Sequence, residues 1–226
     1  MGRTALITGA SGGLGRSIAK TLASNGVKVF LSGRNSDELK SLCFELNEMC
    51  NGFLVADLSD ANEIVSLVEK TKPDILVNCA GIFPVSSLEE TSLKEFDECF
   101  SINVRAPFLL SKLCVPFMKE KGWGRIVNIG SSSAYAGFPN TSVYCSSKHA
   151  LLGFSRSIFH ELKSENIRTY CVSPGSIKTE MCKNVKGQDF DTFMEPEEIS
   201  NFILEIIQYD GNMICEEVRL NRMFTQ

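Results

Sequence analysis

Short apolar runs alternate with longer helical stretches along almost the whole chain, and this alternation constrains the fold more than any other feature. The apolar runs predict strands at residues 4–8, 27–32, 52–56, 75–78, 125–130, 168–173 and 213–220. The stretches between them predict helices at residues 14–25, 37–49, 60–70, 92–119, 142–164 and 197–209. Strands that alternate with helices form right-handed β-α-β units. We therefore expect an α/β fold, with a doubly wound parallel sheet and helices on both faces.

The composition predicts one globular domain over residues 1–226. Hydrophobic residues make up 43% of the chain and charged residues 22%, and no linker, repeat or low-complexity tract divides it, which favours a single core. The net charge of −4 gives no electrostatic reason to expect a nucleic acid or an anionic membrane as partner. No apolar run approaches the ~18 residues of a membrane span.

The nine cysteines are scattered without a Cys-x-x-Cys pair, and several, such as Cys79 and Cys171, lie inside apolar runs. This distribution favours reduced thiols over a disulfide framework or a zinc site, so we expect a cytoplasmic protein without a metal centre. A strand-like run begins at residue 4, so no signal peptide is expected. Leu6 stands where a myristoylation signal requires Ser or Thr.

The first predicted strand runs into a glycine-rich turn. Its residues are Thr8-Gly9-Ala10-Ser11-Gly12-Gly13-Leu14-Gly15, and a helix follows. Glycines let the backbone approach a diphosphate, and the helix N-terminus favours its negative charge. The spacing differs from the common G-x-G-x-x-G fingerprint. The turn predicts a dinucleotide site, and the alternative is a glycine-rich turn that binds nothing.

Three further strand ends carry candidate nucleotide contacts. The second strand ends near Arg34, and no carboxylate stands there to bind the ribose hydroxyls of NAD(H). The positive charge of Arg34 instead favours the 2′-phosphate of NADP(H). The alternative is a solvated surface arginine. Asp57 follows the third strand and could instead cap the next helix. The fourth strand ends Asn78-Cys79-Ala80-Gly81, whose small residues permit close approach of a ribose, or form a plain turn.

The predicted helix 92–119 places one polar residue on an apolar face. Asn103 falls in line with Phe96, Phe100 and Pro107. Because Pro107 has no N–H, the carbonyl of Asn103 loses its helical donor and must find another donor or water. The alternative is a buried Asn in a kinked core helix.

Tyr144 and Lys148 lie four residues apart, which places them on one helical face. A phenol beside an ammonium is a means of obtaining a usable proton donor, although this spacing alone is common. Ser131 closes a predicted buried strand thirteen positions before Tyr144. Ser132 and Ser133 are the competing hydroxyls.

Together, the glycine turn, these residues and Ser173-Pro174-Gly175-Ser176-Ile177-Lys178-Thr179 resemble the short-chain dehydrogenase/reductase family, from residue 4 to about 180. The resemblance implies a Rossmann-like seven-stranded sheet in the order 3-2-1-4-5-6-7 and an NAD(P)-dependent oxidoreductase. It implies a catalytic tetrad of Asn103, Ser131, Tyr144 and Lys148. It further implies cofactor contacts at Gly9, Ser11, Gly13, Leu14, Gly15, Arg34, Asp57, Leu58, Asn78, Ala80, Gly81, Tyr144, Lys148, Pro174, Gly175, Ile177 and Thr179.

The resemblance also assigns roles to the tetrad. Tyr144 would exchange the proton with the carbonyl or alcohol oxygen, and Ser131 would polarise that oxygen. Lys148 would lower the pKa of Tyr144 together with the oxidised cofactor, and would hold the nicotinamide ribose. Asn103 would connect Lys148 to solvent through its carbonyl and a water.

Residues 180–195 resemble the variable substrate loop of the family. Its apolar residues could cover an apolar substrate or simply dock the loop; they are Met181, Phe190, Phe193 and Met194, beside Lys183, Lys186, Asp189 and Asp191. The substrate is expected to be a small carbonyl or alcohol: a 3-oxoacyl thioester, sugar ketone, steroid or hydroxy acid. The resemblance also implies a homodimer or homotetramer, because in the family the helices that match residues 92–119 and 142–164 often pair across a dimer.

Two other functions stay open. An epimerase or dehydratase of sugar nucleotides would use the same Tyr-Lys pair, but about 45 residues after Thr179 are few for the added substrate domain of that branch. A non-catalytic dinucleotide sensor could discard its proton donor, whereas all four tetrad positions are retained in this chain.

Overall fold

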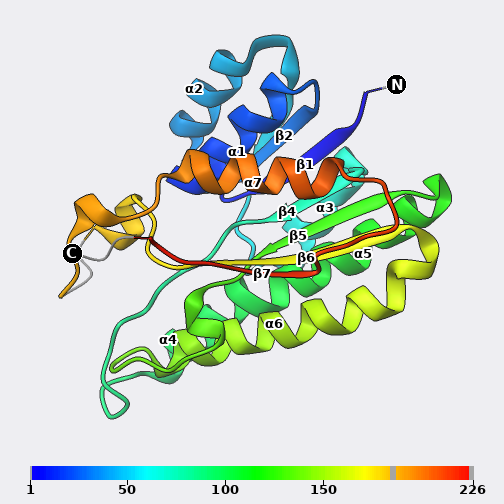
Figure 1. Ribbon diagram of the computed structural model, residues 1–226. Helices are drawn as coiled ribbons and strands as arrows, with labels where there is room; N and C mark the ends of the chain where they lie inside the picture. The colour runs from blue at the N-terminus through cyan, green and yellow to red at the C-terminus, as the bar shows by residue number, and fades with distance from the viewer. Residues whose placement is uncertain (1, 184–186, 224–226) are drawn as a thin grey trace.

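The computed structural model describes residues 2–183 and 187–223 (Figure 1). Its seven strands form one parallel sheet in the order β3-β2-β1-β4-β5-β6-β7, which confirms the expected fold and strand order. The strands are β1 (Thr4–Thr8), β2 (Lys28–Gly33), β3 (Cys50–Val55), β4 (Ile75–Asn78), β5 (Gly124–Ile129), β6 (Ile167–Pro174) and β7 (Glu217–Leu220).

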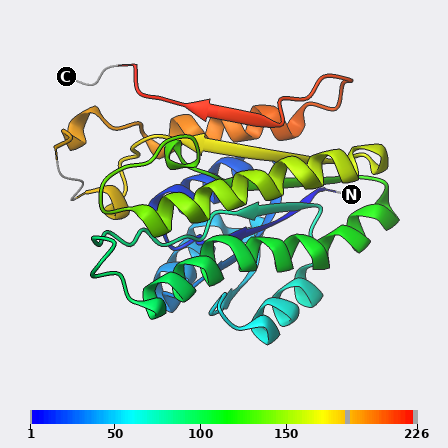
Figure 2. The ribbon, with the colours of Figure 1, turned by 90° about the horizontal axis from the view of Figure 1, so that it is seen from below.

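Helices cover both faces of the sheet (Figures 1 and 2). They are α1 (Gly13–Ser24), α2 (Ser36–Leu46), α3 (Ala61–Thr71), α4 (Leu93–Phe100), α5 (Ala106–Lys121), α6 (Ser142–Leu162) and α7 (Pro196–Gln208). Successive residues of a strand point to opposite faces. Ile7 of β1 therefore packs in the core under α1, α2 and α7, and Leu6 packs in the core over α3 and α5. This double burial explains why the strands lack polar alternation.

The predicted helix 92–119 is broken by a π-helical turn, Ser101–Arg105, between α4 and α5. Pro107 cannot donate to the carbonyl of residue 103, so the regular ladder is interrupted there. In the wider π turn, residues four apart align more closely than residues three apart. Cys99 rather than Phe100 therefore shares the buried face of Asn103. The expectation that Phe96 points inward is wrong, because its side chain is 40% exposed.

The last predicted strand, 213–220, is shorter than expected. Pairing with β6 begins only at Glu217. The guanidinium of Arg168 donates to the carbonyls of Tyr209, Gly211 and Met213. These bonds hold the preceding chain as a loop, so its carbonyls are satisfied without a strand partner.

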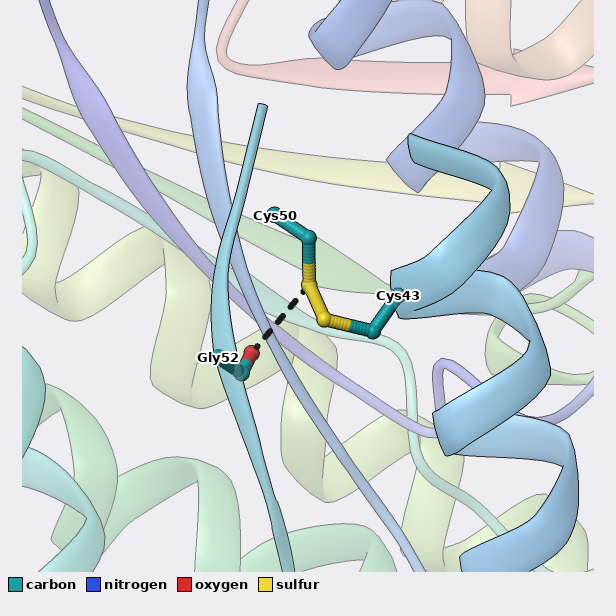
Figure 3. Close-up of a disulfide and its surroundings, with 3 residues drawn as sticks. All are labelled: Cys43, Cys50 and Gly52. Carbon is teal, nitrogen blue, oxygen red and sulfur yellow. Dashed lines mark hydrogen bonds between the residues drawn. A yellow bond between two sulfur atoms is a disulfide. The ribbon is translucent and has the colours of Figure 1, made fainter. Parts of the chain in front are cut away.

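A disulfide joins Cys43, in the last turns of α2, to Cys50, the first residue of β3 (Figure 3). The expectation that all nine cysteines are reduced is wrong for this pair. A short 3₁₀ turn, Asn47–Met49, folds the chain back and brings the two Cα atoms to 5.2 Å, which suits a disulfide. The other seven cysteines, all within the described ranges, are free thiols.

Within residues 2–183 and 187–223, no helix combines the length and the apolar character needed to cross a bilayer.

We expect the Cys43–Cys50 crosslink to stabilise the protein by restricting the unfolded chain. Closing a loop with a sequence separation of 7 corresponds to about 2 kcal/mol. Cys50→Ser should lower the free energy of unfolding by that amount in urea titrations, and dithiothreitol should do the same to the wild type. Cys215→Ser removes an exposed free thiol and is the matched control. Equal stability of Cys50→Ser and wild type would contradict the crosslink.

Candidate active site

The glycine turn is pressed against the loop that follows β4. Gly9 has a φ of +67°, and a Cβ there would lie 2.9 Å from the Cα and N atoms of Ala80. A side chain on Gly15 would collide with the carbonyl of Gly9. Only glycine fits these positions without strain. The turn therefore forms a bare backbone cradle at the N-terminus of α1, which suits the diphosphate of a dinucleotide.

Thr8 joins the same two loops by hydrogen bonds. Its Oγ1 donates to the carbonyl of Val77 at 3.2 Å and accepts from the N–H groups of Cys79 and Ala80 at 3.1 and 3.2 Å. Thr8 is buried, so these bonds are shielded from water. The sequence analysis missed this residue, and the only signal for it is a hydroxyl placed directly before the first glycine.

Arg34 and Asp57 lie on the side of the cradle where the predicted adenosine would bind. A Cβ on Gly33 would lie 2.6 Å from Ser11 Oγ, so the end of β2 touches the glycine turn, and Arg34 follows it, exposed. The N–H of Ser59 donates to Asp57 Oδ1 at 2.8 Å. This bond, helped by the charge of Arg34, lowers the pKa of Asp57. The residue that caps α3 is Asp60, whose side chain accepts from the N–H of Asn62, so the alternative role of Asp57 as that cap is wrong, and its contact with the cofactor stays a prediction.

Several predicted cofactor residues direct their side chains into the protein. Asn78 donates to Asn128 Oδ1 at 2.7 Å, inside the sheet. The side chains of Leu14, Leu58 and Ile177 are buried in the two cores. Only the backbone at these four positions could reach a nucleotide.

The segment from Pro174 to Thr179 closes over the glycine turn. Gly175 donates its N–H to the carbonyl of Leu220 at 2.8 Å, which fixes the chain where it leaves β6. A Cβ on Gly13 would lie 2.9 Å from Cγ2 of Thr179. The two motifs that the sequence separates by more than 150 residues are thus in contact.

Ser131, Tyr144 and Lys148 meet at the carboxyl end of β5. Ser131 lies two residues beyond the end of that strand, and its Oγ accepts from the N–H of Ser133 at 3.1 Å. Tyr144 lies in the first turn of α6, and its ring meets Phe83 edge-on at 4.6 Å. One turn further on, the buried Lys148 donates from Nζ to the carbonyl of Ile129 at 2.9 Å. Its Nζ lies 5.7 Å from the centre of the Tyr144 ring.

Asn103 completes the group from the π turn. Its side chain accepts from the N–H of Ile82 and donates to the carbonyl of the same residue, both at 2.9 Å. It also donates to Ser147 Oγ at 3.0 Å. A Cβ on Gly81 would lie 3.3 Å from Asn103 Oδ1 and 3.7 Å from Lys148 Nζ. The loop after β4 is therefore inserted between Asn103 and Lys148.

Ser147, Ile82 and Phe83 are further site residues that the sequence analysis missed. Ser147 is fully buried, and its Oγ donates to the carbonyl of Tyr144 at 2.7 Å while accepting from Asn103. It thereby ties the π turn to the helix that carries Tyr144. The available signal was a hydroxyl directly before Lys148 on a predicted buried face.

Burial has the largest effect on the pKa values of Tyr144 and Lys148. Loss of hydration raises the pKa of Tyr144 to about 12, and hydrogen bonding with Ser131 opposes that rise. Burial also lowers the pKa of Lys148. Loss of hydration is thus the largest effect of the protein on the Tyr144 pKa, and the expected lowering by Lys148 together with the oxidised cofactor stays a prediction. The phenol therefore carries its proton at neutral pH, the state needed for proton donation.

The structure describes residues 180–183 and 187–195 of the variable loop, so Lys186 lies outside the described residues. Short 3₁₀ turns form at Glu180–Cys182 and Phe190–Thr192, and Met194 pairs with Ile177 as an isolated bridge. Phe193 is buried and docks the loop, whereas Met181 is half exposed. Docking of the loop is therefore confirmed for Phe193, and the covering of an apolar substrate stays a prediction.

Comparison with known proteins gives consistent matches. The family model described as short chain dehydrogenase matches residues 3–189. A 3-oxoacyl-[acyl-carrier-protein] reductase FabG from Rickettsia prowazekii is 39% identical over 200 residues, covering 86% of this chain and 80% of that protein.

Two solved structures are also similar. A 3-ketoacyl-(acyl-carrier-protein) reductase from Brucella melitensis complexed with NADH superposes with a TM-score of 0.90 at 27% identity, covering 97% of this chain and 96% of the other. An actinorhodin polyketide ketoreductase with NADPH gives a TM-score of 0.89 at 25% identity, covering 97% and 95%.

We expect Gly9→Ala to destabilise the protein and to abolish dinucleotide binding, because a Cβ at positive φ would be forced against the backbone of Ala80. Such strain costs of the order of 1–3 kcal/mol. Gly12→Ala is the matched control, since a Cβ there would lie 3.4 Å from the carbonyl oxygen of Gly9, an ordinary van der Waals distance. Urea unfolding and NADPH fluorescence titration measure the two effects. Equal behaviour of both variants would contradict the close approach.

Proposed function

This chain belongs to the short-chain dehydrogenase/reductase family and is an NAD(P)-dependent oxidoreductase acting on C=O or CH–OH groups, and we propose that it reduces a carbonyl with NADP(H), using Tyr144 as general acid. The observation that carries the proposal is the meeting of Ser131, Tyr144 and Lys148 at the carboxyl end of β5, beside the glycine cradle. In parallel sheets this edge is where ligands bind.

In the proposed reaction the protein handles the proton and orients the reactants, while the cofactor, when bound, supplies the hydride. Tyr144 donates its phenolic proton to the carbonyl oxygen. Ser131 Oγ already accepts from Ser133 N–H, so its own proton is directed to the substrate oxygen and stabilises the charge that develops there. Phe83 covers one edge of the Tyr144 ring and limits access of water to the proton donor.

Lys148 and Asn103 support Tyr144 in this proposal. One N–H of the Lys148 ammonium is bonded to Ile129, which leaves two donors for the ribose and for the phenol. The Asn103 side chain fixes the backbone of Ile82, so its own backbone is held in the π turn. Because Pro107 lacks an N–H, the carbonyl of Asn103 is the proposed acceptor for a water that returns a proton to Lys148.

The proposed preference for NADP(H) rests on Arg34. It is exposed where β2 ends, beside the glycine turn, and faces the carboxylate of Asp57 across this corner. A guanidinium here suits the 2′-phosphate of NADP(H). The charge of the diphosphate is balanced separately, by the N–H groups of the glycine turn. Among the structural neighbours, one protein is described with NADH and another with NADPH, so the fold accommodates both dinucleotides.

We further propose a 3-oxoacyl thioester as the first substrate to test, since the similar proteins from Rickettsia and Brucella are described as reductases of that class. The retained Ser131, Tyr144 and Lys148 favour an enzyme over a dinucleotide sensor. Residues 1–226 would act as one catalytic domain in the cytoplasm. An exposed aromatic face on α4, α5 and α6 is the proposed contact of a homodimer or homotetramer; it comprises Phe96, Phe100, Phe108 and Phe154.

Tyr144→Phe removes the proposed proton donor and keeps the ring that packs against Phe83. Turnover of acetoacetyl-coenzyme A, followed as the loss of NADPH absorbance, should fall at least ~100-fold. NADPH binding should be retained, which separates a chemical defect from misfolding. Near-normal turnover by this variant would exclude Tyr144 as the acid.

Arg34→Gln should weaken NADPH binding by about tenfold to a hundredfold, because a charge-assisted bond to the 2′-phosphate is lost. Affinity for NADH should change by no more than about twofold. Lys28→Gln, at the opposite end of β2 and also exposed, is the matched control. Fluorescence titration with both dinucleotides measures these affinities, and a parallel loss for NADH and NADPH would argue against Arg34 as the selective residue.

A further inference from the structure

The chain that follows β7 runs back over part of the variable loop. Figures 1 and 2 both show this stretch beside the loop after β6, at the carboxyl edge of the sheet. We define residues 187–195 as the substrate segment. Arg222, two residues after the end of β7, contacts three residues of it: Gln188, Thr192 and Phe193.

The guanidinium of Arg222 bonds to two separate parts of the substrate segment. One nitrogen donates to Thr192 Oγ1 at 2.7 Å, and the other donates to Gln188 Oε1 at 2.9 Å. The Cζ atom lies 5.0 Å from the centre of the Phe193 ring, within range of a cation–π interaction. Because the guanidinium fork is planar and rigid, it fixes the separation of its two acceptors.

Both acceptors are bonded to other residues as well. Ser176 Oγ donates to the same Gln188 oxygen at 2.7 Å, which connects Arg222 to the chain leaving β6. Thr192 Oγ1 donates to the carbonyl of Asp189 at 2.7 Å. Arg222 therefore sits at the centre of a small network rather than at a single contact.

Besides the bond from Ser176 to Gln188 at its start, the substrate segment is held at its end. Met194 is bridged to Ile177, and Glu195 is paired with Lys178. Gln188 and Asp189 are exposed. Arg222 joins Gln188, near the start of the substrate segment, to Thr192, near its end, so it spans the 3₁₀ turn Phe190–Thr192.

We propose that Arg222 is a positioning residue that sets the place of the substrate segment, and thereby the affinity for substrate. The proposal rests on the proposed function, in which this segment borders the substrate. Arg222 does not touch the tetrad, so its loss should raise KM and leave kcat nearly unchanged. A large thioester should be affected more than a small ester of the same acyl group, because it extends further from the reacting carbon.

The kinetic test compares Arg222→Ala and Arg222→Lys with the wild type, using NADPH and either acetoacetyl-coenzyme A or methyl acetoacetate. Arg222→Ala should raise KM for the thioester by about tenfold, the effect of losing a charge-assisted bond, with kcat within about twofold. Arg222→Lys should be intermediate, since an ammonium lacks the fork. Guanidinium chloride at millimolar concentration should partly restore Arg222→Ala, whereas sodium chloride should not.

Arg219→Ala is the matched control. Arg219 lies on β7 itself, with its guanidinium 4.3 Å from the centre of the Tyr135 ring and not on the substrate segment. It should leave KM unchanged. An unchanged KM in Arg222→Ala, or an equal rise in both variants, would overturn the proposal while leaving the proposed function intact.

A second measurement keeps the inference testable if the substrate class is wrong. Chymotrypsin should cleave at Phe190 faster in Arg222→Ala than in the wild type or in Arg219→Ala, because the segment is released. If the wild type consumes no NADPH with either substrate, the proposed substrate fails and the cleavage rates still decide the role of Arg222. Equal cleavage of all three proteins would overturn that role.

Discussion

The site depends on one backbone contact, the approach of Gly9 to Ala80. It holds the glycine turn after β1 against the loop after β4, and Thr8 reinforces it with bonds to Cys79 and Ala80. One residue beyond Ala80, Gly81 fits between Asn103 and Lys148. The nucleotide cradle and the proton-handling residues are therefore mounted on opposite sides of the same short loop, and a shift of that loop would disturb both.

Burial sets the protonation states that Tyr144 and Lys148 favour. A phenol and an ammonium that are both withdrawn from water each favour the uncharged form, and the pKa values of Tyr144 and Lys148 move accordingly. The protonated phenol can give up its proton to an oxygen that gains negative charge during reduction. The two groups share a helical face, and the bond from Lys148 Nζ to the carbonyl of Ile129 holds the ammonium 5.7 Å from the centre of the Tyr144 ring.

Local patterns were enough to predict β1 and β4 with the observed bounds, and the four-residue spacing correctly placed Tyr144 beside Lys148. Features that depend on a change of helix geometry were not predictable in this way. The π turn rotates Phe100 away from the face of Asn103, and a 3₁₀ turn brings Cys43 to Cys50. The pKa of Tyr144 depends on packing from several elements, and the hydrogen bonds of Arg222 join positions 30 or more residues apart.

The course of the chain after β7 has a practical consequence for anyone handling the protein. Residues 221–223 pass beside the substrate segment at the same edge as the site, whereas β1 begins at the opposite edge (Figure 1). An affinity tag or fluorescent fusion that follows this stretch would therefore be anchored beside the substrate segment. The same tag placed ahead of residue 2 would be separated from that segment by the full length of the strands.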